Sequence, residues 1–197
     1  MQRIKKILQV GHPVLRKQAT EIKQSDIQQD KIQTLADLMV AVLYENQGVG
    51  LAAPQIGESR QVIIIENSPG KSRRKKADDF FPQHILINPK LVKASGGLVL
   101  DWEACLSIDN GDLLGLVPRN ASVIVEALDR AGKKTVLKAR GFMARVLQHE
   151  IDHLNGILFT ERMRKKDMTS LTTRHYWEKY YNNSKKIYAN SVTILKT

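Results

Sequence analysis

Apolar residues recur at helical spacing in two parts of the chain. Between Ser25, a good N-cap, and Gly48, a suitable stop, they form one stripe that would face a core. The members of this stripe are Ile32, Leu35, Ala36, Met39, Val42 and Leu43. A second helix is predicted from about Phe142 to Leu154, with Gly156 positioned to end it.

The second predicted helix carries two histidines on its apolar side. His149 and His153 are four residues apart and continue the stripe formed by Phe142 and Val146. Side chains with this spacing lie on one face of a helix. We therefore expect both imidazoles to point into the protein rather than into solvent.

Short apolar runs between the two helices predict β-strands. They cover residues 61–66, 84–88, 98–102, 121–128 and 134–140. Residues 129–132 (Asp-Arg-Ala-Gly) predict a hairpin turn, whereas residues 67–83 and 109–115 are expected to be loops. A last helix is predicted within residues 167–182. Because strands and helices do not alternate strictly, the pattern indicates an α+β fold.

The composition of the 197 residues is that of a globular protein with a basic surplus. With 31 Lys and Arg against 20 Asp and Glu, the net charge of +11 favours an anionic partner such as RNA, although a solvated basic surface explains it equally well. Charge alone does not indicate sequence-specific binding to nucleic acid. No apolar run approaches the roughly 20 residues of a membrane span, and the single cysteine excludes an internal disulfide. We expect a cytoplasmic protein with no membrane partner.

Residues 149–153 (His-Glu-Ile-Asp-His) form an H-E-x-x-H motif on the second predicted helix. Two imidazoles at positions i and i+4 can bind one metal ion. Glu150 follows the first of them and can reach a water on the metal, for which a carboxylate is a suitable base. The motif therefore predicts a metallohydrolase site with His149 and His153 as ligands.

A catalytic metal needs a third protein ligand, and the chain offers several candidates. One metalloprotease pattern places a histidine at position 159, but Phe159 cannot bind a metal, so that class is excluded. Another class uses a glutamate, which makes Glu161 and Glu178 candidates. Cys105, which lies 44 residues (149 − 105) before His149, is the remaining soft donor and would suit Zn(II) or Fe(II).

Three segments resemble, in order, the motifs of the peptide deformylase family, which are GxGLAAxQ, EGCLS and HExDHxxG. They are residues 48–55 (Gly-Val-Gly-Leu-Ala-Ala-Pro-Gln), 103–107 (Glu-Ala-Cys-Leu-Ser) and 149–156 (His-Glu-Ile-Asp-His-Leu-Asn-Gly). Residues 12–16 (His-Pro-Val-Leu-Arg) are similar to the family's opening segment and leave no room for a cleaved leader. The resemblance covers about residues 4–165, and three ordered motifs are far more specific than one.

The resemblance implies that the chain hydrolyses the N-formyl group from the starting methionine of nascent polypeptides and releases formate. The implied metal ligands are Cys105, His149 and His153. The implied metal is Fe(II), which Zn(II), Ni(II) or Co(II) can replace. The implied fold has short mixed or antiparallel sheets around a central helix that carries the H-E-x-x-H motif, followed by a C-terminal helix.

The resemblance also implies roles for other residues. Glu150 would be the general acid–base group, and Gln55 and the backbone N–H of Leu106 would face the formyl oxygen. Residues assigned to substrate binding are Gly50 at the peptide backbone, Glu103, and Val49, Phe142 and Val146 as candidates for the methionine pocket.

Two positions depart from the family pattern. Ala104 replaces the usual glycine, a change that is mild if its φ is negative, as we expect. Arg145 stands where the family usually has an apolar residue near the methionine pocket. Either its stem lines the pocket and its head reaches water, or substrate preference is altered.

Three hypotheses follow for the function. The first is an active peptide deformylase, with residues 1–165 as the catalytic domain and residues 166–197 as a C-terminal helical extension and tail. The second is a metallopeptidase that uses Glu161 or Glu178 as third ligand. The third is a catalytically weak relative that binds the ribosome. Even an active enzyme is expected to meet the ribosome transiently, through the basic residues Arg162, Arg164, Lys165 and Lys166.

Overall fold

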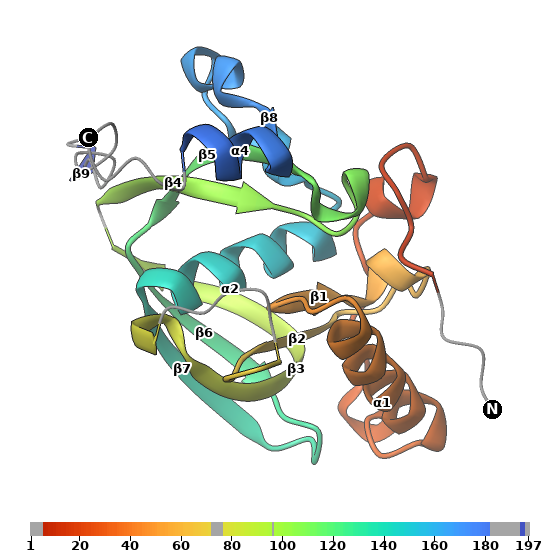
Figure 1. The fold of residues 1–197 in the computed structure, drawn as a ribbon. Helices are drawn as coiled ribbons and strands as arrows, with labels where there is room; N and C mark the ends of the chain where they lie inside the picture. Colours follow the sequence, from red (N-terminus) through yellow and green to blue (C-terminus); the bar gives the residue numbers. More distant parts are fainter. Residues whose placement is uncertain (1–5, 72–76, 96, 182–193, 196–197) are drawn as a thin grey trace.

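The computed structural model describes residues 6–71, 77–95, 97–181 and 194–195. Helix α2 (Gly141–Leu154) runs through its centre, between two antiparallel sheets (Figure 1). Helix α1 (Asp30–Glu45) lies to one side of the first sheet. This arrangement confirms the predicted α+β fold with short antiparallel sheets around a central helix.

The first sheet has five strands in the order β1-β2-β3-β6-β7. Their bounds are β1 (Gly50–Ala52), β2 (Val62–Asn67), β3 (Phe81–Ala94), β6 (Ser122–Leu128) and β7 (Lys134–Arg140). The predicted hairpin joins β6 and β7, where Asp129 N–H donates to Lys133 O at 2.9 Å and Gly132 adopts a φ of +79°. Positive φ is a conformation that glycine adopts without strain.

Strand β2 is buried on both faces and joins the two main parts of the core. Ile63 and Ile65 face α2, while Val62 and Ile64 pack with the apolar stripe of α1. All six residues of the predicted stripe on α1 are buried, as expected. The first sheet thus lies between α1 and the central helix α2.

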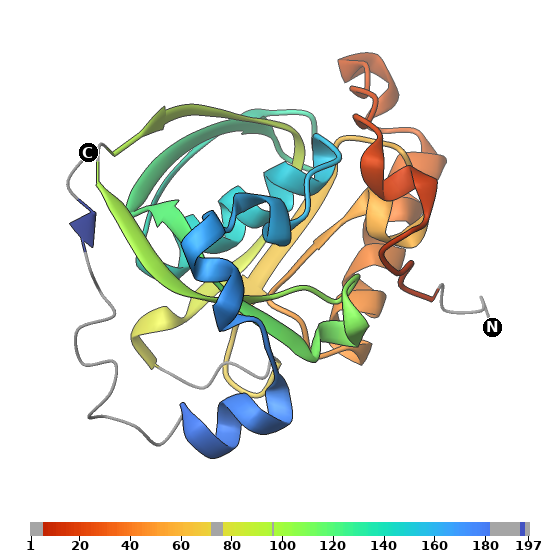
Figure 2. The same ribbon diagram turned by 90° about the horizontal axis from the view of Figure 1, so that it is seen from above.

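The second sheet covers the opposite side of α2. Its order is β8-β5-β4-β9, and its strands are β8 (Thr172–Thr173), β5 (Leu113–Asn120), β4 (Leu98–Ala104) and β9 (Ile194–Leu195). Two more helices, α3 (Phe159–Arg162) and α4 (Arg174–Tyr180), follow α2, and Figure 2 shows α4 at the edge of the molecule. Short 3-10 turns occupy residues 13–16, 24–26, 53–56, 77–79, 109–111 and 165–170.

Several predicted boundaries were wrong. The first helix begins at Asp30 rather than after Ser25, because residues 24–26 form a separate 3-10 turn. It ends at Glu45, and Gln47 rather than Gly48 adopts the positive φ. The last helix is short, covering Arg174–Tyr180 within the predicted span.

Two strands differ from the prediction because of their prolines. Strand β5 was missed, since Leu113 onward was expected to be a loop and Pro118 interrupts the apolar run. Pro118 is tolerated because β8 pairs only with Leu113 and Leu114, so that, among the described residues, no strand pairs with Pro118 on that side. Strand β3 runs from Phe81 to Ala94 rather than over 84–88, passing Pro89 by a register shift between Ile87 and Lys90.

Candidate active site

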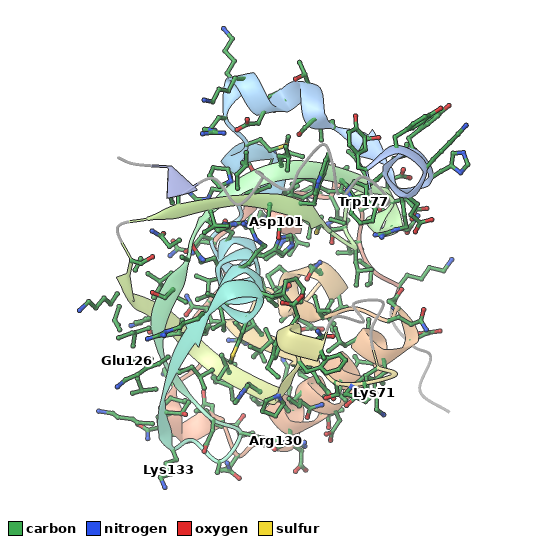
Figure 3. The ribbon with its side chains drawn as sticks, turned by 60° about the vertical axis from the view of Figure 1, so that its left-hand side comes forward. Lys71, Asp101, Glu126, Arg130, Lys133 and Trp177 are labelled. Atoms are coloured by element: carbon green, nitrogen blue, oxygen red, sulfur yellow. The ribbon has the colours of Figure 1, made fainter. Side chains whose placement is uncertain are left out.

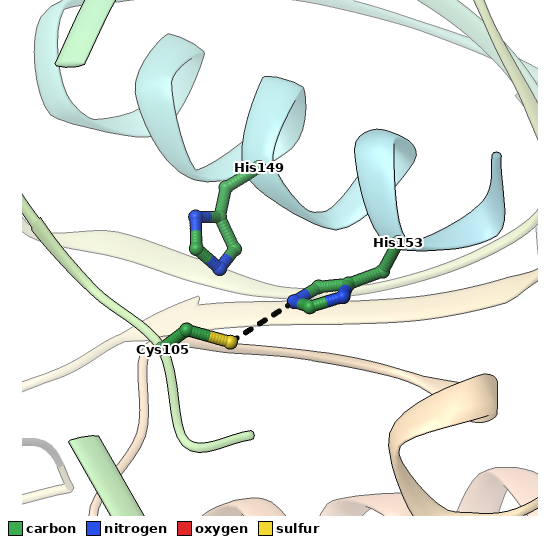
Figure 4. A group of neighbouring side chains, drawn as sticks. All are labelled: Cys105, His149 and His153. Carbon is green, nitrogen blue, oxygen red and sulfur yellow. Dashed lines mark hydrogen bonds between the residues drawn. The ribbon is translucent and has the colours of Figure 1, made fainter. Parts of the chain in front are cut away.

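Helix α2 presents His149 and His153 on its buried face, toward the end of β4 (Figure 4). Cys105 follows the last residue of β4, and its Sγ lies 3.2 Å from His153 Nε2. One ligand atom from each of Cys105, His149 and His153 lies within 4.8 Å of the others. All three residues are buried. The structure thus brings Cys105 next to two histidines that follow it by 44 and 48 positions in the chain.

Glu103 orients the first histidine. Its Oε2 lies 2.9 Å from His149 Nδ1, which leaves His149 Nε2 directed toward Cys105 and His153. Arg119 binds the same carboxylate with two hydrogen bonds of 2.9 and 3.0 Å. Burial disfavours the charge of Glu103, but the bond from His149 and the charge of Arg119 prevail and hold its pKa well below the usual range. A carboxylate on the outer nitrogen of a ligand histidine fixes its ring orientation.

Arg119 connects this carboxylate to a second one on α2. Its Nη1 donates to Asp152 Oδ2, and Arg162 also pairs with Asp152, at 2.6 Å. Arg119, Glu103 and Asp152 are all buried. Neither Arg119 nor Asp152 was assigned a role from the sequence; Asp152 lies inside the third motif, whereas Arg119 lies outside all three.

Glu150 points into the same region. Its Oε2 is buried and has no hydrogen-bond partner among the described residues. Burial, the largest influence, raises the pKa of the Glu150 carboxyl to about 7. Gly50 lies directly opposite and has no side chain. A Cβ at this position would lie only 2.8 Å from Glu150 Cδ, so the glycine leaves room for the carboxylate. A buried carboxyl oxygen without a partner is suited to bind a water or substrate atom.

Gln55 is held in one orientation beside the cysteine. Its Oε1 accepts from Ala52 N–H at 2.8 Å, which directs Nε2 to Ser107 Oγ at 3.2 Å and Cys105 Sγ at 3.7 Å. The side chain is buried. Its amide N–H groups therefore face the cluster formed by Cys105, His149 and His153. Ser107 was not singled out from the sequence and is recognisable only by this contact.

A cavity of about 1020 Å³ opens beside this cluster. Ten of the eleven predicted site residues line it, namely Val49, Gly50, Gln55, Glu103, Cys105, Leu106, Phe142, Val146, His149 and Glu150. His153 is not among the lining residues, and its Nε2 contacts Cys105 Sγ at 3.2 Å. Arg174 and Trp177, which were not predicted to belong to a site, also line the cavity, as does Glu178, which was considered only as an alternative metal ligand.

The structure shows how Ala104 and Arg145, the two residues that depart from the family pattern, are accommodated. Ala104 ends β4 in regular pairing with Leu114 and has no positive φ, so its side chain is accommodated, as expected. Arg145 borders the cavity, but its head does not reach water. It is buried and donates to Glu103 Oε1 at 2.7 Å and to the carbonyls of Val99 and Val117. Of the two alternatives given for Arg145, the one with an exposed head is wrong, because these acceptors lie within reach of the guanidinium group.

The alternative third ligands lie in other contacts. Glu161 pairs with Arg16 and accepts from Leu158 N–H at 2.9 Å, while Glu178 is exposed on α4. Within the described residues, the grouping of possible metal ligands contains Cys105 and the two histidines and neither glutamate. One thiolate and two imidazoles are a donor set that suits Fe(II) and Zn(II). The residues present therefore fit a divalent metal ion.

Comparisons with known proteins agree with this geometry. A family model described as polypeptide deformylase matches residues 4–169. Peptide deformylase 2 of Nostoc sp. is 36% identical over 179 residues, covering 91% of this chain and 96% of its own length. The peptide deformylase of Desulfitobacterium hafniense is 41% identical over 162 residues, covering 82% of this chain and 96% of its own.

A solved structure shows the same fold. The Met-Ala-Ser-bound class I type b peptide deformylase of Acinetobacter baumannii superimposes with a TM-score of 0.75 at 33% identity, covering 81% of this chain and 99% of its own. Within the described part of the chain, none of the helices combines the length and apolar character that crossing a bilayer requires. The chain belongs to the peptide deformylase family, the metal-dependent hydrolases that remove the N-formyl group from the N-terminal methionine of nascent peptides.

Proposed function

We propose that this chain deformylates nascent peptides in the cavity beside α2, with Cys105, His149 and His153 holding one Fe(II) ion. Zn(II), Ni(II) or Co(II) would occupy the same donors. A divalent ion held there would act as a Lewis acid and lower the pKa of a coordinated water. Support for these ligands comes from their mutual distances and from Glu103, which orients His149.

Glu150 is the proton carrier in this proposal. Its unpartnered Oε2 faces the cavity, where it can take a proton from the attacking water and return it to the leaving amine. The formyl C–N bond breaks, and formate and a free α-amino group result. Gly50 supports this role because its missing side chain leaves room for the Glu150 carboxylate.

The remaining residues would hold the substrate. Gln55 Nε2 and the backbone N–H of Leu106 would stabilise negative charge on the formyl oxygen, and losing one such donor typically costs about 10²–10³ in rate. Gly50 would bind the peptide backbone. The methionine side chain would lie against Val49, Phe142 and Val146, which line the cavity. Glu103 acts as a positioning residue through His149.

The observation that carries the proposal is the convergence of three metal donors, two of which line the cavity, with a carboxyl oxygen of Glu150 that has no hydrogen-bond partner among the described residues. The test is formate release from formyl-Met-Ala-Ser under anaerobic conditions, with the protein loaded with Fe(II) or Zn(II). We expect release with both and faster release with Fe(II). No formate with any of Fe(II), Ni(II), Co(II) and Zn(II) would overturn it. Anaerobic handling protects the thiolate from oxidation.

We also propose transient contact with the ribosome in the cytoplasm, where nascent chains emerge. Of the four predicted basic residues, Arg162 and Arg164 are engaged with Asp152 and Asp167, so the contact rests on the exposed Lys165 and Lys166. Co-sedimentation with ribosomes should weaken as salt rises and weaken further in a Lys165→Glu/Lys166→Glu variant. Binding that neither change affects would contradict this contact.

A further inference from the structure

One wall of the cavity comes from a part of the chain outside the family match. The family model ends at residue 169, whereas Arg174, Trp177 and Glu178 of α4 line the cavity together with Cys105 and Glu150. Helix α4, which lies beyond the residues matched by the family model, therefore forms part of the cavity wall. Figure 3 shows Trp177 where α4 meets the sheet that carries Asp101.

Helix α4 is fastened to the loop that follows the cysteine. Arg174 N–H donates to Asp112 O at 2.6 Å, and its Nη2 donates to Gly111 O at 2.6 Å. Just before it, β8 pairs with β5 through Leu113 and Thr173. These bonds join α4 to the same segment that positions Cys105, so the wall keeps its place relative to the metal ligands.

Aromatic contacts hold the other end of the helix. The Trp177 ring meets Trp102 of β4 edge-on, with centroids 6.3 Å apart and an interplanar angle of 73°. Tyr181 packs on the same Trp102 ring at 5.3 Å. Edge-to-face aromatic pairs of this kind are stabilising. Trp177 is therefore a rigid, half-buried apolar surface at the cavity.

The exposed end of this wall carries the negative charge of Glu178. Arg174 lies 3.4 Å from Asp112, which offsets its charge. Glu178 is exposed, lines the cavity, and forms no ion pair with another described residue. In a chain with a net charge of +11, the cavity wall thus carries a carboxylate that has no ion-pair partner within residues 6–71, 77–95 and 97–181.

We infer that Trp177 and Glu178 form the surface that receives the residues after methionine, and that Glu178 favours cationic side chains there. The inference rests on the proposed function. With the formyl group at Cys105 and Glu150 and the methionine side chain at Val146, the peptide must leave the cavity along another wall. Helix α4 provides such a wall. The Trp177 ring offers an apolar surface to the peptide, and the Glu178 carboxylate can pair with a lysine or arginine side chain.

The test compares kcat/KM of the metal-loaded full chain for formyl-Met-Lys-Lys and formyl-Met-Glu-Glu. We expect the unmodified chain to prefer the lysine peptide about two- to fivefold, the range of an exposed charge pair. Glu178→Lys should reverse this preference, and salt should weaken it. Trp177→Ala should lower kcat/KM for formyl-Met-Ala-Ser about fivefold relative to formyl-methionine amide.

Tyr180→Lys is the matched control, because Tyr180 is exposed on the same helix and is absent from the cavity lining. It adds a positive charge nearby and should keep the lysine preference. A lysine-to-glutamate ratio that is the same with Glu178 and with Glu178→Lys would overturn the inference. Failure to release formate even from formyl-methionine amide would instead overturn the proposed function.

Discussion

The Glu150 carboxylate lies directly against the backbone of Gly50, with no room for a side chain between them. A Cβ at position 50 would lie 2.8 Å from Glu150 Cδ and 2.9 Å from Glu150 Cγ. Gly50 begins β1 and pairs with Ile65 in the first sheet, so its backbone cannot move away freely. The sheet thus limits where the carboxylate of α2 can lie.

Replacing Gly50 with alanine should displace this carboxylate. We expect Gly50→Ala to retain the metal but to lose about 10²-fold in kcat, the cost typical of a misplaced catalytic group. Formate release and metal content measured on the same sample check this. Full activity in Gly50→Ala would show that Glu150 tolerates a different position.

Removing the carboxylate itself should be at least as costly. Glu150→Ala should keep the metal, because the three ligands remain, yet lose at least about 10²-fold in rate. Metal analysis and formate release are the measurements. A Glu150→Ala variant as active as the unmodified chain would refute the acid–base role.

The Cys105 thiolate should be required for tight metal binding. Cys105→Ala should lose tight binding, because it removes one of three neighbouring donors. A chelator should then lower the melting temperature of the unmodified chain and leave that of Cys105→Ala unchanged, since a ligand stabilises only a fold that binds it. Retention of tightly bound metal in Cys105→Ala would favour a glutamate as third ligand.

Arg119 should be important for stability. It lies between the buried carboxylates of Glu103 and Asp152, and Arg119→Met would remove the cation that they share, leaving Arg145 beside Glu103 and Arg162 beside Asp152. Removing one partner of a buried ion pair costs about 3–5 kcal/mol of unfolding free energy, and we expect the lower end of this range because each carboxylate keeps another cation. Arg130→Met is the control, because its ion pair with Asp37 is exposed and worth at most about 1 kcal/mol. Urea unfolding with chelator present measures both, and equal effects would contradict the assignment.

Glu161 should make stability depend on pH. The bond from Leu158 N–H, and then Arg16 and Arg162, lower the pKa of Glu161 below its usual 4.5. A lowered pKa in the folded state stabilises above the unfolded value, and this stabilisation is lost as pH falls through the lowered value. Glu161→Gln should therefore melt below the unmodified chain at pH 7, with the difference shrinking in acid. A difference constant with pH would contradict this.

The sequence by itself determined the features that depend on near neighbours. Helical spacing identified the buried stripe of α1 and placed His149 and His153 on one face of α2. The order of three motifs indicated the family and Cys105 as third ligand, whereas residue chemistry alone left Cys105, Glu161 and Glu178 open. Periodicity and short motifs are local properties, so they can be read without the fold.

The tertiary structure alone decided contacts between distant segments. It buried the Arg145 head beside Glu103, joined Arg119 to two carboxylates, and placed α4 at the cavity. It also paired β5 with β4 despite Pro118. No local pattern encodes these contacts, because a charged side chain is buried only where partners from other elements satisfy it, and a proline is tolerated only where a strand edge is free.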